Sequence, residues 1–225
     1  MTAPALVLFD LDGTLVDSVH DLAAAADDTM RALGHVPPGE AKVRTWVGNG
    51  IERLVHRCLT GDMHADAPAA EFDAAMSRFM RCYERRNGEC SIVYAGAAQG
   101  LAAARAAGAQ LGCVTNKSRR FTAPLLSRLG LAHWFDVVVS GDTAARKKPH
   151  PDPLLHAAAA LGVAPADTLL VGDSENDVRA ARAAGMRVLC VSYGYNHGRD
   201  IREACPDAVM DSLAELAGLL DGTSR

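Results

Sequence analysis

The apolar run Leu6–Phe9 ends abruptly at two acidic residues, Asp10 and Asp12, which are followed by Gly13 and Thr14. A short apolar run bounded in this way is typical of a buried strand in a parallel sheet. The two carboxylates would then lie at the carboxyl end of the strand, where open α/β sheets bind their ligands. Because carboxylates this close repel each other, the pair indicates either a bound divalent cation or one shared proton. The alternative interpretation is an Asp-Gly turn with a helix cap.

Length and composition are those of an ordinary globular protein. The chain has 225 residues, of which 49% are hydrophobic and 22% are charged, and its net charge is −4. This acidic balance provides no basic surface for nucleic acid. No apolar segment approaches the roughly 20 residues of a membrane helix, and the N-terminus lacks the basic region of a signal peptide. We therefore expect a cytoplasmic monomer or homodimer that binds neither nucleic acid nor a membrane.

The cysteine and histidine residues do not indicate a zinc site. The six cysteines show no C-x-x-C spacing, and the eight histidines form no pair at ligand spacing. We expect all six cysteines to be reduced and structural.

After Thr14 the hydrophobic pattern becomes helical. Apolar residues recur at helical spacing in four successive segments, and the breaks between them are rich in glycine and proline. Residues 16–88 are therefore predicted to form four helices and no strand.

From Tyr94 onward, predicted strands alternate with predicted helices. Predicted strands with the turns that follow them lie at 111–117, 137–142 and 168–173, a fifth strand lies at 187–192, and helical segments separate them. This alternation requires right-handed crossovers and a parallel sheet covered by helices on both faces. We therefore predict a Rossmann-like three-layer α/β core, formed by residues 1–15 and 89–225, with an all-helical domain inserted at 16–88.

Polar residues recur directly after the predicted strands. Thr115 and Asn116 follow the second strand, Lys148 lies in the loop after the third, and Asp173 follows the fourth. In a parallel sheet, all of these positions lie at the same edge as the first acid pair. Such a site suits phosphoryl transfer, because a carboxylate can attack phosphorus while a metal and a lysine neutralise the phosphoryl oxygens. Carboxylate ligands favour Mg²⁺ as the metal.

Each of these residues also has a simpler explanation. Thr115 can be a strand-end hydroxyl or a helix cap, Asn116 a turn residue, and Asp173 the cap of the following helix. Lys148 ends a basic run of the kind found on solvated surfaces, although Pro149 favours an extended backbone for it.

Four motifs in this order resemble those of the haloacid dehalogenase superfamily over the whole chain. They are Asp10-Leu11-Asp12-Gly13-Thr14, Thr115, Lys148 and Gly172-Asp173-Ser174-Glu175-Asn176-Asp177. The resemblance implies an enzyme, a phosphatase that works through an aspartyl-phosphate intermediate. It also implies that the helical domain at 16–88 is a cap that closes over small substrates.

The resemblance assigns a role to each motif. It makes Asp10 the nucleophile and Asp12 the general acid/base, and an acid at the Asp12 position disfavours halide removal. Mg²⁺ would be held by the Asp10 side chain, the Asp12 backbone carbonyl and the Asp173 side chain.

The phosphoryl group, by the same resemblance, would be held by Thr115, Asn116 and Lys148. Asp177, the last residue of the fourth motif, lies one turn beyond Asp173. We expect it to orient Lys148 or Ser174 from outside the site rather than to bind the metal.

Within the superfamily the chain is most similar to the bacterial phosphoglycolate phosphatases. The similarity rests on Val114-Thr115-Asn116-Lys117, on residues 141–151 and on Tyr193-Gly194-Tyr195-Asn196. It implies that 2-phosphoglycolate is hydrolysed to glycolate and phosphate. The alternatives are a phosphatase for another small substrate, such as a sugar phosphate or pyrophosphate, a phospho-acceptor signalling domain, and a non-catalytic scaffold.

Selection of so small a substrate requires a group that recognises its carboxylate. We expect the turn Gly48-Asn49-Gly50 to offer backbone N–H groups to it, with added charge from Arg44 or Arg53. The alternative is that this segment is simply a turn between two helices.

Overall fold

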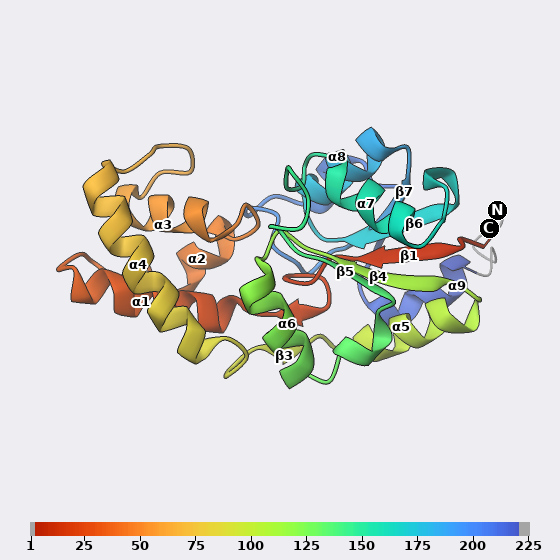
Figure 1. Cartoon of the computed structure of the whole chain (residues 1–225), viewed down its shortest axis with the longest axis horizontal. Helices are drawn as coiled ribbons and strands as arrows, with labels where there is room; N and C mark the ends of the chain where they lie inside the picture. Colours follow the sequence, from red (N-terminus) through yellow and green to blue (C-terminus); the bar gives the residue numbers. More distant parts are fainter. Residues whose placement is uncertain (1–2, 221–225) are drawn as a thin grey trace.

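The computed structural model describes residues 3–220 and contains a six-stranded parallel sheet beside a body of four helices (Figure 1). The strands lie in the order β5-β4-β1-β6-β7-β8. Their bounds are Leu6–Phe9 for β1, Gln110–Val114 for β4, Val137–Val139 for β5, Thr168–Gly172 for β6, Arg187–Val191 for β7 and Ala208–Met210 for β8. The central strand β1 is fully buried, as the apolar run predicted.

Helices cover both faces of this sheet, which confirms the predicted three-layer α/β class (Figure 1). Alternate side chains of β1 enter different cores. Val7 and Phe9 pack in one core, and Leu6 and Leu8 in the other. The helices on the first face are α5 (Ala97–Ala106), α6 (Arg119–Arg128) and α9 (Leu216–Leu220), and those on the second are α7 (Asp152–Ala160) and α8 (Glu175–Ala184).

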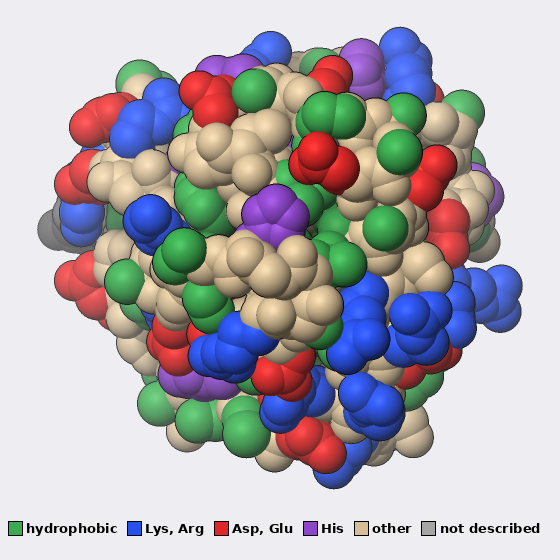
Figure 2. Space-filling model, turned by 90° about the vertical axis from the view of Figure 1, so that its left-hand side faces the viewer, with side chains coloured by type: hydrophobic (Ala, Val, Ile, Leu, Met, Phe, Trp, Pro, Cys, Tyr) green, Lys and Arg blue, Asp and Glu red, His purple; other side chains and the backbone are tan. Residues whose placement is uncertain are grey.

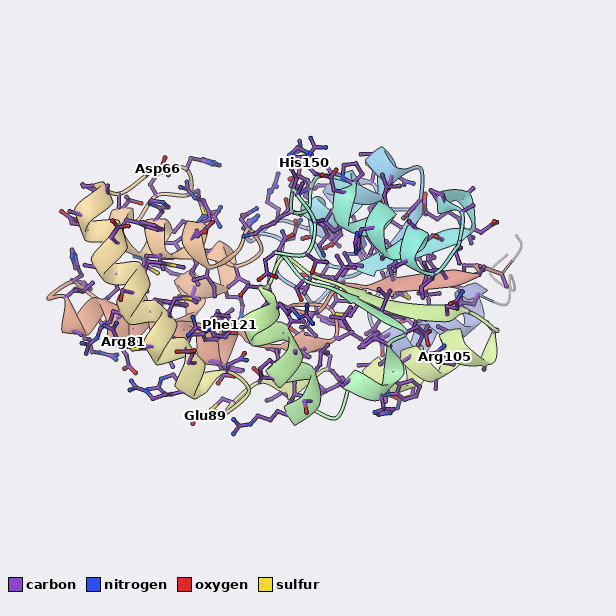
Figure 3. The ribbon with its side chains drawn as sticks, in the orientation of Figure 1. Asp66, Arg81, Glu89, Arg105, Phe121 and His150 are labelled. Atoms are coloured by element: carbon purple, nitrogen blue, oxygen red, sulfur yellow. The ribbon has the colours of Figure 1, made fainter. Side chains whose placement is uncertain are left out.

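The remaining four helices form a separate hydrophobic core, and we call them the helical body. Their bounds are Val19–Ala32 for α1, Glu40–Trp46 for α2, Ile51–Thr60 for α3 and Ala69–Arg86 for α4. Trp46, Phe79 and Tyr83 are among the large side chains of this core. We call the six-stranded sheet with α5 to α9 the sheet domain. Phe121 of α6 also packs into the core of the helical body, 4.7 Å from Tyr83 between ring centroids, and lies at the junction of the two parts (Figure 3).

The two chain connections between the helical body and the sheet domain are tied together. Short strands β2 (Val16–Asp17) and β3 (Ile92–Val93) pair there in antiparallel fashion. Nearby, the buried Asp21 carboxylate accepts hydrogen bonds from the backbone N–H groups of Gly88, Cys90 and Ser91 at 2.8–3.1 Å. The prediction of no strand in residues 16–88 was therefore wrong, because a strand of two residues is too short to produce an alternating pattern.

Three further elements differ from the sequence prediction. Strand β8 was not predicted. Pro124 predicts that the regular part of its helix begins near Thr122, but α6 begins at Arg119 and accommodates Pro124 in its interior. The sequence also predicts a final helix at 212–220, and the structure starts it as a short 3₁₀ turn. The 3₁₀ turns are Ala132–Trp134, Pro165–Asp167, Ile201–Ala204 and Leu213–Glu215.

The outer end of the helical body carries both signs of charge, with apolar side chains scattered between them (Figure 2). In the part of the chain from 3 to 220, we find no helix with the length and apolar character needed to cross a bilayer.

Candidate active site

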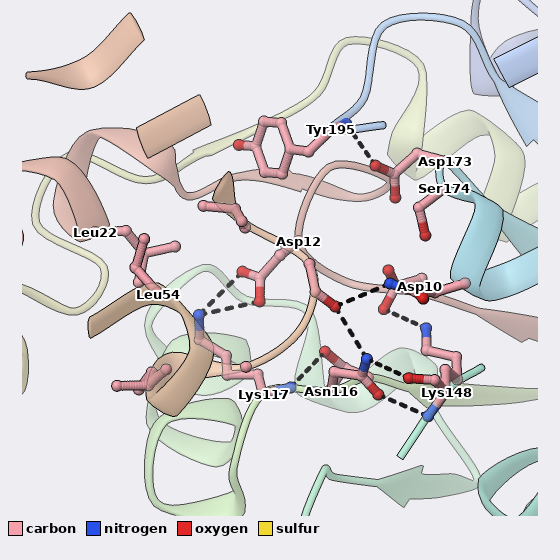
Figure 4. A pocket seen from close by; sticks show the side chains of 16 residues that line it. Asp10, Asp12, Leu22, Leu54, Asn116, Lys117, Lys148, Asp173, Ser174 and Tyr195 are labelled. Carbon is pink, nitrogen blue, oxygen red and sulfur yellow. Dashed lines mark hydrogen bonds and ion pairs between the residues drawn. The ribbon is translucent and has the colours of Figure 1, made fainter. Parts of the chain in front are cut away.

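A small cavity lies between the carboxyl edge of the sheet and the helical body, and it encloses about 50 Å³ (Figure 4). The sheet domain lines it with the predicted polar residues Asp10, Asp12, Thr115, Asn116, Lys148, Asp173 and Ser174. The helical body closes it with uncharged residues, namely Leu22, Val47, Gly48, Gly50, Ile51 and Leu54. A cavity of this size and polarity suits a small charged ligand.

Lys148 is buried in a network of acceptors rather than solvated. Its Nζ lies 2.8 Å from Asp10 Oδ1 and 2.6 Å from Asp177 Oδ1, and it donates to the Val114 carbonyl oxygen at 2.9 Å. Burial favours the neutral amine, but the two carboxylates outweigh burial and raise the pKa of Lys148 above its usual range. The side chain is therefore a fixed positive charge beside Asp10.

Asp177 holds Lys148 and the start of α8 at the same time. Its Oδ1 accepts from Lys148, while its Oδ2 accepts from Ser174 Oγ at 2.6 Å and from the Ser174 backbone N–H at 3.1 Å. This is a capping box, in which Ser174 is the N-cap residue. Both oxygens of Asp177 are thus occupied by protein donors.

Asp173 is held by two donors and enclosed by two glycines. Its Oδ1 accepts from Thr14 Oγ1 at 2.7 Å and its Oδ2 from the Tyr195 backbone N–H at 2.6 Å. A Cβ atom at Gly13, where φ is +92°, would lie 2.3 Å from Asp173 Oδ2, and one at Gly194 would lie 2.2 Å from Asp173 Cβ. The Asp-Gly turn therefore serves to bring the backbone close to this carboxylate.

The acid cluster has the composition of a site for a divalent cation. Carboxylate oxygens of Asp10, Asp173 and Asp177 all lie within 4.8 Å of one another, and all three residues are buried. Burial raises the pKa of Asp10 to about 7, Lys148 opposes this shift and Asp177 adds to it. Burial and the neighbouring acids also raise the pKa of Asp173. Oδ1 of Asp10 is buried, and the partner found for it among the described residues is the Lys148 ammonium group.

This buried negative charge exceeds what one lysine neutralises, so a cation fits the cluster. Asp10 and Asp173 line the cavity whereas Asp177 does not, so the side chains open to such a cation are those of Asp10 and Asp173.

The Asp12 side chain lies apart from this cluster. Its two oxygens are 3.0 and 3.1 Å from Lys117 Nζ, and Oδ1 also accepts from Ser18 Oγ. Lys117 in turn donates to the hydroxyl of Tyr83, on helix α4, at 2.6 Å. Figure 4 shows the Asp12 carboxylate directed at Lys117 and away from Asp10.

Thr115 and Asn116 make their contacts mainly with the surrounding loops. Thr115 Oγ1 accepts from the Lys117 backbone N–H at 3.1 Å. Asn116 Oδ1 accepts from the Lys148 N–H at 2.9 Å, and Asn116 Nδ2 donates to the carbonyl oxygens of Lys148 and Gly48 at 2.9 and 3.0 Å. Asn116 thus fixes the Lys148 loop and joins it to the helical body.

The turn Gly48-Asn49-Gly50, between α2 and α3, contributes residues to two different hollows of the surface. Gly48 and Gly50 line the cavity, whereas Asn49 accepts a hydrogen bond from Arg57 at 2.9 Å and lines a neighbouring cleft. Within residues 3–220, the backbone N–H groups of this turn donate no hydrogen bond.

The two arginines expected near this turn have other partners. Arg44 pairs with Asp17 and Glu40, and Arg53 pairs with Asp66. Neither arginine lines the cavity.

Comparison with known proteins identifies the family. A family model of haloacid dehalogenase-like hydrolases matches residues 4–185. The chain belongs to this family. A phosphoglycolate phosphatase from Nitrosococcus oceani is 49% identical over 217 residues, which cover 96% of each chain. Another from Thiobacillus denitrificans is 47% identical over 94% of this chain and 93% of its own.

Two solved structures share the architecture over nearly the whole chain. The crystal structure of a predicted phosphoglycolate phosphatase from Haemophilus somnus 129pt superposes with a TM-score of 0.90 at 33% identity, over 100% of both chains. CbbY from Rhodobacter sphaeroides, crystallised in complex with phosphate, superposes with a TM-score of 0.76 at 29% identity, over 95% and 96% of the two chains.

Three polar residues of this hydrolase's site were not predicted as such. Lys117 and Tyr195 belong to stretches quoted above only for the resemblance, and Tyr83 was not singled out in the sequence. A polar run of three residues directly after a strand, Thr115 to Lys117, is the signal that could have identified Lys117. The sequence contains no comparable signal for Tyr83.

Proposed function

We propose that this protein is a Mg²⁺-dependent phosphatase that hydrolyses 2-phosphoglycolate to glycolate and phosphate. The observation that supports the phosphatase chemistry most directly is the buried Lys148, whose Nζ lies 2.8 Å from Asp10 Oδ1 beside the acid cluster. The names of the relatives that align over nearly the whole chain support the choice of ester.

Asp10 acts first in this proposal. Its carboxylate attacks phosphorus, a bond forms between Asp10 and phosphorus, and the bond from phosphorus to the ester oxygen breaks. Asp12 gives a proton to the departing oxygen, which leaves as the hydroxyl of glycolate. Water then gives a proton to Asp12 while its oxygen bonds to phosphorus. The bond between Asp10 and phosphorus breaks, which releases phosphate and restores the Asp10 carboxylate.

The surrounding residues prepare this site for negative charge. Lys148 neutralises phosphoryl oxygens, and Thr115 supplies a hydroxyl donor to them. Mg²⁺, bound by the Asp10 side chain, the Asp12 backbone carbonyl and the Asp173 side chain, would neutralise further charge on the transferred group. Asn116 completes the phosphate-binding set mainly by holding the Lys148 loop in place.

The residues around this set have supporting roles. Asp177 and Ser174 fix Lys148 and the start of α8. The helical insert at 16–88 acts as the cap domain, and the amides of Gly48, Asn49 and Gly50 complete the wall on the substrate side. Cytoplasmic location and a monomeric or homodimeric state remain predictions from the sequence.

A panel of phosphate esters assayed with Mg²⁺ tests this function. We expect kcat/KM to be highest for 2-phosphoglycolate and turnover to stop when EDTA removes the metal. Asp10→Asn should remain folded at the assay temperature but lose at least about 10³-fold in kcat, because the nucleophile is gone. A higher kcat/KM for a sugar phosphate or for pyrophosphate would replace the proposed substrate, and Mg²⁺-dependent turnover by Asp10→Asn would reject the mechanism.

A further inference from the structure

Lys117 is a buried cation whose acidic partner is the proposed proton donor. Its side chain is 3% exposed, and its Nζ contacts both oxygens of Asp12 and the hydroxyl of Tyr83. Burial raises the pKa of Tyr83 to about 12, so this hydroxyl is neutral and cannot balance the lysine charge. The charge of Lys117 is therefore balanced by Asp12.

The cavity offers a ligand carboxylate few other cations. Of the described residues that line it, two are basic, Lys117 and Lys148. Lys148 is fixed by Asp10, by Asp177 and by a backbone carbonyl. The wall from the helical body carries no charge, because Arg44 and Arg53 point to partners outside the cavity.

The Asp12 carboxylate cannot pair with Lys117 and act at the ester oxygen at the same time. In the structure both of its oxygens contact Lys117, and the proposed proton transfer needs the same carboxylate at the ester oxygen. If Asp12 left without a replacement, Lys117 would remain as a buried, unpaired charge, which is strongly unfavourable. A carboxylate carried by the substrate would remove that cost.

We propose that Lys117 recognises the carboxylate of the substrate, and that this carboxylate replaces Asp12 at Lys117 Nζ. The inference rests on the proposed function. One ion pair breaks and an equivalent one forms, so the buried charge stays balanced. The released Asp12 carboxylate is then free to take the proton that the phosphate monoanion of the substrate carries and to give it to the leaving oxygen. Lys117 is thus a specificity residue that affects kcat as well as KM.

A pair of isosteric substrates isolates this effect. Phosphoglycolamide has the shape of 2-phosphoglycolate but carries a neutral amide in place of the carboxylate. We expect the unaltered protein to prefer 2-phosphoglycolate by about 100-fold in kcat/KM, the range of a buried charge pair that loses one partner. In Lys117→Met this preference should disappear, because kcat/KM falls about 100-fold for 2-phosphoglycolate and is unchanged or higher for the amide.

Lys42→Met is the matched control, since Lys42 is exposed on α2 of the helical body. This substitution should leave kcat/KM unchanged for both 2-phosphoglycolate and phosphoglycolamide. Lys117→Arg, which keeps the charge, should retain part of the preference.

Equal losses on the two substrates in Lys117→Met would overturn the inference and leave the proposed phosphatase intact. If Lys117→Met melts below the assay temperature, the comparison of the two substrates on the unaltered protein still tests the inference. Similar kcat/KM values for 2-phosphoglycolate and phosphoglycolamide would overturn the inference. Failure of the unaltered protein to hydrolyse 2-phosphoglycolate at all would instead reject the proposed function.

Discussion

Asp10 illustrates how a buried acid can be unfavourable for folding and favourable for function. Its carboxylate lies among Asp173, Asp177 and Lys148, where burial raises its pKa to about 7 from an ordinary value of 3.8. A carboxyl with a raised pKa binds its proton more tightly in the folded state than in the unfolded state. Its contribution to stability is therefore complete below 3.8 and is lost as the pH rises through about 7.

Thermal unfolding at different pH values tests this account of Asp10. In EDTA, the unaltered protein should lose stability between about pH 5 and about pH 7 relative to Asp10→Asn, which lacks the titrating group. Mg²⁺ should raise the melting temperature more at the higher pH, because protons compete with the cation for Asp10. The same pH dependence in both proteins would contradict the assignment.

At the scale of single residues, position could be predicted but the direction of a side chain could not. Asp10, Thr115 and Asp173 were predicted because each directly follows an apolar run, and strand ends meet at one edge of a sheet. That Asp12 turns to Lys117 depends on a tyrosine from a helix of the other domain, Tyr83. Nothing in the local sequence encodes that contact.

Among the elements, the junction between the helical body and the sheet domain is organised around Asp21 of α1. This carboxylate is 1% exposed and accepts hydrogen bonds from Gly88, Cys90 and Ser91, where the chain returns to the sheet domain. Because the donors of Gly88 and Ser91 would be left buried without a partner, the carboxylate is expected to be important for stability.

Asp21→Ala should therefore lower the free energy of unfolding by about 3 kcal/mol. Urea denaturation measures this change directly. Asp73→Ala, at an exposed position on α4, is the control and should change stability by less than about 0.5 kcal/mol. Equal effects of the two substitutions would show that Asp21 does not clamp the junction.

The elements that could be predicted are those with a repeating pattern. The buried strands β1, β4, β6 and β7 are apolar runs, and helices α1 to α4 repeat their apolar residues at helical spacing. Strands β2 and β3 have two residues each, and their pairing joins residues 16–17 to 92–93. Such pairing depends on the folded arrangement of the whole chain rather than on local sequence.

On the scale of the molecule, the site is closed by two bodies of different character. The sheet domain supplies the charged residues, and the helical body supplies an uncharged wall together with Tyr83. Two residues link these bodies. Lys117 contacts Tyr83 of the helical body and Asp12. Asn116 contacts Gly48 of the helical body and the Lys148 backbone. Any relative movement of the two bodies would therefore be transmitted to Asp12 and to the Lys148 loop.

The central claim is that Asp10 carries the phosphoryl group during turnover. Rapid quenching in acid after mixing with Mg²⁺ and 2-phosphoglycolate labelled at phosphorus measures this directly, because an acyl phosphate survives brief exposure to acid. The account predicts that labelled protein appears before the steady state, that the label maps to the peptide containing Asp10, and that Asp10→Asn acquires none. Turnover without labelled protein at any time, or label on a different residue, would contradict it.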